Sequence, residues 1–422
     1  MTDVAQAETG PTPPEAVRPG GDDGAPLAFP FTRKCPLSTP QEYAELRDAG
    51  PATKVRLQLS GKEAWLLTRH EDVKRVLGDP AMSSDAKSPG YPLQFPVPEE
   101  VLQFIKFPFS ALDAPEHTVQ RRLVIPEFTA HRIQALRPRI QQIVDERIDA
   151  LLAAGDTADL VKELAAPVPS LLFCEMLGAD PADIDYFRRY SEVTMNREST
   201  QEDVTTLYAE MDGFLGRLIT EKEKNPGDDL LSRLAAKNRE EGADLELADL
   251  VSIARLLVVA GFDTTANMIG LGTLVLLENP EAADALRADP SLSRKAVDEL
   301  LRFLSIADSA TVRVATADIE IGDVTIRAGE GVIASNGAAN WDSAVFEDPH
   351  VFDIHRDARN HLAFSNGPHQ CLGANLARVQ LEIVFETLLA RIPTLRLAVP
   401  VEELSFMHGG HIYGLHELPV TW

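Results

Sequence analysis

Cysteine is scarce in this chain: the 422 residues include three, at Cys35, Cys174 and Cys371. Their number is odd and they lie far apart, which excludes a disulfide framework and a C-x-x-C metal site. Any chemistry at sulfur must therefore come from a single thiol in a special local setting.

Positive charge is also in short supply. The chain has 40 Lys and Arg against 65 Asp and Glu, a formal net charge of −25. This balance excludes a general nucleic-acid binder and opposes docking on an anionic membrane. The longest charge-free apolar run, residues 264–277, is too short to cross a bilayer, and the N-terminus has no signal-peptide core. We expect a soluble, cytoplasmic protein with no nucleic acid and no membrane as partner.

The chain divides once, near its start. Residues 1–28 are rich in Pro and Gly with almost nothing apolar, so they cannot offset the entropy of ordering and predict a disordered tail. No second linker of this composition and no fixed-period repeat follows. Residues 29–422 are therefore predicted to form a single domain.

Helical patterns outnumber strand patterns in that domain. A hairpin is predicted from Val55–Leu59 and Ala64–Leu67, and further strands between Thr311 and Ser335. Apolar residues at three- and four-residue spacing predict helices over 138–153, 202–224 and 280–303. The predicted class is mainly α with a small β subdomain.

One predicted helix is unusual, because residues 247–279 are apolar on nearly every side. Such a helix belongs in the interior of a large protein. Its middle nevertheless carries Ala260, Gly261, Asp263 and Thr264, and polar groups buried there are costly unless they are paired or used. A proton relay facing a cavity is one interpretation; a Thr hydroxyl bonded back to the preceding turn is the other.

The cysteine with a special setting is Cys371. It follows a Gly- and Pro-rich loop, and a helix predicted over 372–389 begins directly after it. A helix N-terminus favours a thiolate, Gly367 permits a positive φ, and Gly373 permits the close approach of a flat group. A buried structural cysteine is the alternative.

Two pairs of charged residues have helical spacing. Glu299 and Arg302 lie three apart on one face, and His117 and Arg121 lie four apart, where they could grip one anionic group. Solvated helix faces explain either pair equally well when it is taken alone.

Taken in order along the chain, these motifs resemble the cytochrome P-450 (haem-thiolate monooxygenase) family from about Phe29 to Trp422. Its F-x-x-G-x-x-x-C-x-G pattern is matched at Phe364, Gly367, Cys371 and Gly373, its E-x-x-R at Glu299, and its A/G-G-x-D/E-T-T at residues 260–265. Ser365 departs from the usual glycine. The resemblance implies the family fold, with the long central helix crossing a haem.

The resemblance also implies roles for individual residues. Cys371 is expected to hold the iron of haem b as a thiolate, and Asp263 and Thr264 to be the catalytic acid–alcohol pair. Glu299, Arg302 and Arg356 are expected to form a structural charge network. The remaining cofactor contacts are expected at His117, Arg121, Ala260, Gly261, Arg313, Phe364, Gly367, His369 and Gly373.

The expected reaction is oxygenation of a hydrophobic small molecule with O2, either hydroxylation or epoxidation. Resemblance to actinobacterial members implies a macrolide, polyketide, ansamycin or sterol-like substrate and secondary-metabolite or antibiotic biosynthesis. Arg255, Asp308 and His408 are further polar candidates, and residues 88–100 a predicted lid. The apolar substrate contacts are expected at Val258, Val259, Phe262, Ile306 and Met407.

No nicotinamide or flavin motif is present, so electrons are expected from a ferredoxin and its reductase. Docking is expected on the Cys371 side, near Arg121, Arg122 and Arg378, and the enzyme is expected to be a monomer. Two alternatives stay open: an enzyme that uses peroxide or reduces nitric oxide, and a non-catalytic haem or ligand carrier.

Overall fold

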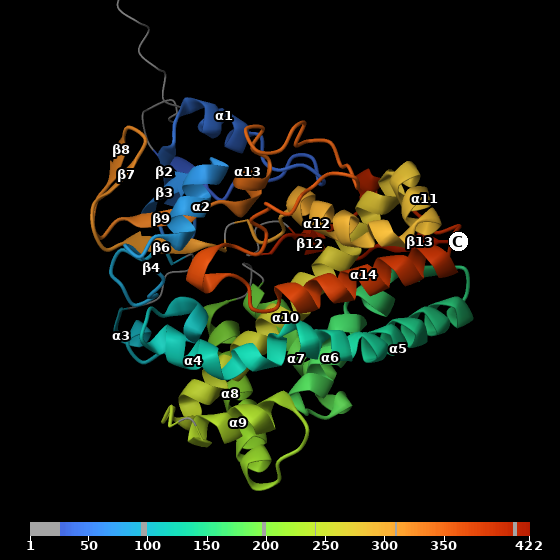
Figure 1. Ribbon diagram of the computed structural model, residues 1–422, viewed down its shortest axis with the longest axis horizontal. Helices are drawn as coiled ribbons and strands as arrows, with labels where there is room; N and C mark the ends of the chain where they lie inside the picture. The colour runs from blue at the N-terminus through green and yellow to red at the C-terminus, as the bar shows by residue number, and fades with distance from the viewer. Residues whose placement is uncertain (1–25, 94–98, 196–199, 241, 309, 408–411) are drawn as a thin grey trace, which may run out of the picture.

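The computed structural model describes residues 26–93, 99–195, 200–240, 242–308, 310–407 and 412–422. Helices make up most of the molecule, and the strands of the largest sheet lie together at one side of it, at the left in Figure 1. This confirms a mainly α protein with a small β subdomain. Among the described residues, no helix combines the length and apolar character of a membrane span.

The long helix predicted from its apolar surface is α10, Leu247–Glu278, within one residue of expectation. Glu246 and Asp249 start it with reciprocal side-chain to backbone hydrogen bonds, which satisfy amide groups left free at a helix N-terminus. Other helices and a strand cover it, which explains why it is apolar on most sides. Its neighbours are α6 (Pro167–Leu177), α7 (Ile184–Met195), α8 (Gln201–Lys224), α12 (Ser293–Leu304), α14 (Ala374–Arg391) and β12 (Gly414–Leu415).

The main sheet has six strands in the order β1-β2-β3-β9-β6-β4. The predicted hairpin is confirmed as the antiparallel pair β2–β3, and residues 311–335 contribute β6 and β9. Strand β1 pairs in parallel with β2, so Leu27 and Ala28, the last two residues assigned to the predicted tail, lie in a strand. The strands are β1 (Leu27–Phe29), β2 (Ala52–Leu57), β3 (Glu63–Leu67), β4 (Met82–Ser83), β6 (Val312–Ala315) and β9 (Gly331–Ala334).

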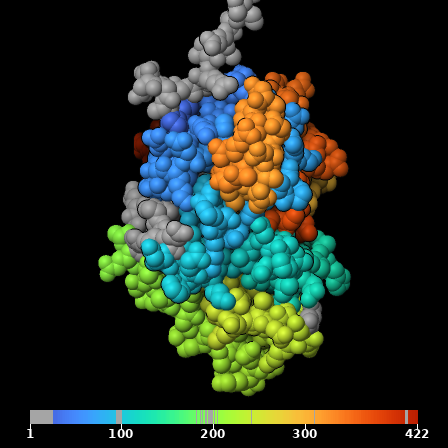
Figure 2. Space-filling model, turned by 90° about the vertical axis from the view of Figure 1, so that its left-hand side faces the viewer, coloured from blue at the N-terminus to red at the C-terminus, as the bar shows by residue number. Residues whose placement is uncertain are grey.

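Three smaller sheets complete the β structure. On the face shown in Figure 2, the hairpin β7–β8, in orange, lies beside the blue surface of the first described residues. The pair β11–β12 lies against α10 through β12. The strands are β5 (Thr157–Asp159), β7 (Ile319–Ile321), β8 (Val324–Ile326), β10 (Arg396–Leu397), β11 (Phe406–Met407) and β13 (Pro419–Thr421), the remaining sheet having the order β10-β13-β5.

Two predicted helix boundaries are wrong, and both concern proline. Helix α5, Ala130–Ala154, continues through Pro138 instead of starting there, because its packing against α14 buries residues on both sides of the proline. The segment 280–303 is two helices, since a 3-10 turn at Pro290–Leu292 separates them. The other helices are α1 (Glu42–Ala49), α2 (His70–Gly78), α3 (Glu99–Leu102), α4 (Glu116–Val124), α9 (Leu230–Glu240), α11 (Pro280–Ala288) and α13 (Asn336–Asn340).

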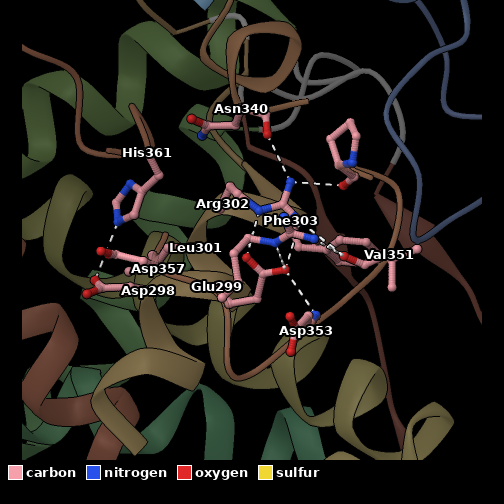
Figure 3. Close-up of polar contacts among 12 residues, drawn as sticks. Asp298, Glu299, Leu301, Arg302, Phe303, Asn340, Val351, Asp353, Asp357 and His361 are labelled. Carbon is pink, nitrogen blue, oxygen red and sulfur yellow. Dashed lines mark hydrogen bonds and ion pairs between the residues drawn. The ribbon is translucent and has the colours of Figure 1, made fainter. Parts of the chain in front are cut away.

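The predicted charge network is present and fully buried at its centre (Figure 3). Arg302 binds Glu299 through two bonds of 2.7 and 2.8 Å, and Arg356 adds a contact of 3.2 Å to the same carboxylate. The Arg302 guanidinium also donates to backbone carbonyl oxygens of Asn340, Pro349 and Val351. Each charged group has several hydrogen-bond partners, so the network ties α12 to the loops after α13.

Gly261 is needed for packing. A Cβ atom added there would overlap the ring of Phe173 on α6, so glycine lets the two helices approach. The cofactor contact expected at Gly261 is therefore not its role in this structure, because the missing side chain's space is filled by protein.

Removing the charge of Glu299 should destabilise the protein strongly. Glu299→Gln keeps the side-chain size but leaves buried Arg302 short of its anion, which should lower the free energy of unfolding by about 3–5 kcal/mol. Asp318→Asn is the control, because it breaks an exposed pair with Arg327 and should change little. Urea-induced unfolding followed by circular dichroism measures both; equal losses would contradict the assignment.

Two glycines of α10 should respond to alanine with opposite signs. Gly261→Ala forces overlap with Phe173 and should lower the free energy of unfolding by about 1–3 kcal/mol. At Gly270 the nearest atom to an added Cβ is 3.5 Å away, so Gly270→Ala should raise it by about 0.5–1 kcal/mol through helix propensity. If urea unfolding gave changes of the same sign in the free energy of unfolding of both variants, the contact with Phe173 would not be the reason for the glycine at position 261.

Candidate active site

The loop before Cys371 is folded by its glycines and backbone bonds. Gly367 has φ +75°, as expected, and a Cβ atom there would lie 2.5 Å from the carbonyl oxygen of Leu77. The Cys371 N–H donates to the Phe364 carbonyl oxygen at 2.9 Å, and α14 starts at Ala374. Ser365, where the family pattern has glycine, also has a positive φ of 61°. The serine therefore keeps the loop conformation at a cost in backbone strain.

The sulfur of Cys371 faces open space although protein surrounds it. Cys371 is solvent-accessible, yet burial raises the pKa of its thiol. Backbone hydrogen bonds from Gly373 and Ala374 and the positive charges of Arg121 and Arg378 act in the opposite direction. These donors stabilise a thiolate, and an accessible sulfur inside the molecule is suited to bind a metal.

Helix α10 leaves one strip of its surface open at mid-length. Leu256, Val259, Ala260, Asp263 and Thr264 are accessible to different degrees, and their spacing of three and four places them on one face. The rest of this turn is buried. Since α10 packs against α14, the strip and the Cys371 loop belong to neighbouring elements. An open strip on the most enclosed helix marks an internal site.

The polar pair on this strip combines a hydroxyl with a carboxylate. The Thr264 hydroxyl donates to the Ala260 carbonyl oxygen at 2.7 Å, the back-bond considered above. Its oxygen can still accept a hydrogen bond, and rotation of the hydroxyl frees the proton. Asp263 lies next to it, half-buried. The pair can therefore hold or pass a proton on the open side of the helix.

The predicted anion-gripping residues come together from three elements. His117 and Arg121 on α4, Arg313 on β6 and His369 in the cysteine loop form one group, with the two histidine rings 4.2 Å apart. Arg121 donates to the Gln370 carbonyl oxygen at 2.6 Å. Burial and the neighbouring positive charges lower the pKa of His369 to about 3. The group is thus a concentration of donors.

Three nitrogen atoms of this group are buried and have no hydrogen-bond partner among the described residues: His117 Nε2, His369 Nδ1 and an Arg313 Nη. The nearby carboxylate of Asp113 is already bonded to Ser83 and Ser84. Buried donors are normally satisfied, so these await acceptors such as the carboxylates of a bound group. A haem, with a metal for Cys371 and two propionates for these donors, fits the residues present.

Tyr91 also belongs to this region, although no sequence pattern points to it. Burial raises its pKa to about 12, and the positive charge of Arg313 opposes this rise. The tyrosine lies in the segment predicted as a lid. Gly90 packs so closely on the loop at Gly329 that an added Cβ would overlap its backbone, so the described part, 88–93, is fixed on the sheet. The lid prediction is therefore wrong for these residues; 94–98 lie outside the described residues.

The predicted substrate contacts separate into two groups. Val259 lies on the open strip, and Met407 is half-buried on β11, whose partner Gly414 contacts Asn267 of α10. Val258, Phe262 and Ile306 instead lie in the hydrophobic core, with Phe262 packed on Phe173 and Phe187. Hydrophobicity alone does not tell the two faces of α10 apart.

The polar candidates have structural partners. Arg255 forms an ion pair with Asp212 of α8, and Asp308 binds Tyr43 and the Ser335 hydroxyl. Both predictions of substrate contacts are therefore replaced by roles in packing. His408 lies outside the described residues.

Comparison with known proteins supports one family. The family model described as cytochrome P-450 matches residues 184–395. A vitamin D3 dihydroxylase of Streptomyces griseolus is 47% identical over 396 residues, 94% of this chain and 97% of that protein. A pentalenic acid synthase of Streptomyces avermitilis is 46% identical over 407 residues, 96% of this chain and 99% of that protein.

A solved structure agrees with these sequence matches. Cytochrome P-450 MoxA from Nonomuraea recticatena has a TM-score of 0.85 and 50% identity, covering 94% of this chain and 98% of its own. Because the aligned region spans nearly the full length of both chains, it includes the whole fold and all of the motifs named above. The chain belongs to the cytochrome P-450 family of haem-thiolate monooxygenases.

Proposed function

We propose that this enzyme uses O2 and two externally supplied electrons to hydroxylate or epoxidise a medium-to-large hydrophobic natural product. The observation that carries the proposal is the accessible Cys371 just before α14, together with the accessible mid-length strip of Asp263, Thr264 and their neighbours on α10, which packs against α14. A metal ligand and a proton-handling pair are the two parts that activation of O2 needs from the protein.

The cofactor in this proposal is haem b. Cys371 binds its iron as a thiolate, and His117, Arg121, Arg313 and His369 bind its propionates through the donors described above. Phe364, Gly367 and Gly373 shape the loop on the thiolate side, and Ala260 offers a small surface on the other. When bound, the haem supplies the redox centre at which O2 is activated and transferred.

Asp263 and Thr264 serve the proton side of the reaction in this proposal. Because the Thr264 hydroxyl donates its one proton to the Ala260 carbonyl oxygen, its oxygen would accept a hydrogen bond from a protonated reacting oxygen, and Asp263 would pass protons from water. The bond to Ala260 orients this acceptor before O2 arrives. This pair favours monooxygenation over the peroxide-using or nitric-oxide-reducing alternative.

A hydrophobic substrate is supported by the open strip and by relatives. Leu256, Val259 and Ala260 give α10 an apolar surface beside the polar pair, and Met407 lies on a strand pair that packs on the same helix. Pockets of this kind take largely apolar molecules. The names of two relatives, a vitamin D3 dihydroxylase and a pentalenic acid synthase, support the same substrate class.

Electrons come in this proposal from a ferredoxin and its reductase, docked near the Cys371 loop. The residues suited to this contact are fewer than expected. Arg122 is exposed, but Arg121 is half-buried against Gln370 and Arg378 is bound to Asp298. A non-catalytic haem carrier would need no such surface and remains the second alternative.

Thiolate ligation by Cys371 should be visible in the reduced carbonyl complex. The purified protein should be coloured, and its complex with carbon monoxide should absorb at the long wavelength typical of thiolate-bound haem. Cys371→Ser should lose this band, whereas Cys35→Ser, which removes another exposed cysteine, should keep it. A wild-type band like that of imidazole-bound globins would overturn the proposal. The same spectra, screened with macrolactones, ansamycins, sterols and fatty acids, identify ligands.

Replacing the polar pair should separate monooxygenation from the alternatives. With a ligand from that screen, Thr264→Ala and Asp263→Asn should lower O2-driven product formation by about 10²-fold or more, the usual contribution of acid–base groups. Thr264→Ser keeps the hydroxyl and should retain far more product than Thr264→Ala. Turnover driven by added peroxide should survive in all three. Equal losses with peroxide and with O2 would contradict the proton-transfer role.

A further inference from the structure

Arg378 on α14 has an unexpected position for a cation predicted to lie at a docking surface. Its guanidinium carbon is 4.6 Å from the centre of the Phe364 ring, and its Nε donates to Asp298 Oδ1 at 2.7 Å. The side chains of Arg378 and Asp298 are 16% and 7% exposed. The guanidinium therefore contacts an aromatic ring and a buried carboxylate and has little contact with solvent.

His361 completes this arrangement beside Arg378. Its Nδ1 accepts the Ala363 N–H at 3.1 Å, so in the neutral ring the proton is on Nε2, which lies 3.5 Å from Asp298 Oδ1 (Figure 3). Burial lowers the pKa of His361, which favours this neutral form. The imidazole and Phe364 ring centres are 5.6 Å apart. Asp298 is thus fixed by Arg378 and His361, and Arg294 lies 3.6 Å from its other oxygen. Because Arg378 Nη2 lies only 3.3 Å from His361 Nε2, these two side chains pack side by side against the same side of Phe364.

The held phenylalanine is directly joined to the cysteine. The Phe364 carbonyl oxygen accepts the Cys371 N–H at 2.9 Å, so a shift of Phe364 moves the backbone that carries the sulfur. The positive charge of Arg378 also acts on the sulfur and lowers the pKa of Cys371, second to that of Arg121 among the charges. Arg378 therefore reaches Cys371 by contact and by charge.

We propose that Asp298, His361 and Arg378 form a one-sided clamp, a linked group that packs against Phe364, positions the Cys371 thiolate and tunes how strongly it donates electrons to the iron. The proposal rests on the proposed function, because it assumes that Cys371 binds haem. A nearby positive charge favours the reduced, more negative iron–thiolate unit, and Asp298 balances part of that charge. Arg378 is a positioning residue in this account, and its charge is adjusted by its partner.

The reduction potential of the haem-loaded protein tests the clamp without any donor protein. In a mediated titration, Arg378→Gln removes the positive charge and should shift the potential to more negative values. Asp298→Asn leaves Arg378 stacked with its charge unbalanced and should shift it to more positive values. Arg137→Gln is the matched control, since it removes a part-buried arginine from the carboxylate of Glu382 without touching Phe364, and should leave the potential unchanged.

The outcomes are distinguishable. Shifts of opposite sign support the clamp, whereas a purely structural role would move both variants in the same direction and overturn it. A wild-type potential in Arg378→Gln, with haem bound and the thiolate-type carbonyl band intact, would also overturn it. If Arg378→Gln does not bind haem, the reduction potentials of Arg378→Lys and Asp298→Asn provide the test instead. A wild-type protein without that carbonyl band refutes the proposed function itself.

Discussion

The enclosure of α10 is the constraint on which the rest of this structure depends. Helices on several sides and the β11–β12 pair cover it, and Gly261 lets α6 come close enough to seal one side. Away from its two ends, the helix stays accessible along the face that includes Ala260, Asp263 and Thr264. Because polar groups are too costly to bury unused, this accessible face is where a carboxylate and a hydroxyl occur together.

Hydrogen-bond satisfaction separates the structural charges from those of the site. Arg302 is completely buried and each of its contacts is to a carboxylate or carbonyl oxygen of the protein. Arg313 is nearly as buried but keeps a nitrogen atom without a partner among the described residues, and so do His117 and His369. The first arrangement is complete as folded, whereas the second becomes complete with a bound dicarboxylate.

Local patterns predicted the elements well where one force dominated. The all-round apolar surface predicted α10 almost to the residue, and strand patterns predicted β2–β3 and β7–β8. The effect of proline on helix boundaries was predicted wrongly at two positions, in opposite ways. Pro138 is carried inside α5 because packing on α14 outweighs its lost hydrogen bond, whereas Pro290 does end a helical segment that periodicity joined. Nothing local separates these two cases, since the difference lies in the partner helix.

The sequence by itself determined which family motifs the chain carries. The motif around Cys371, the Asp263–Thr264 pair and the Glu299–Arg302 spacing indicate a haem-thiolate monooxygenase, because such motifs consist of residue identities in a fixed order. Only the tertiary structure decided which face each side chain occupies. It placed Val259 on the open strip and Phe262 in the core, and it withdrew Arg378 from the surface to Phe364. The placement of these side chains depends on residues that are distant in the chain, so no local sequence pattern predicts it.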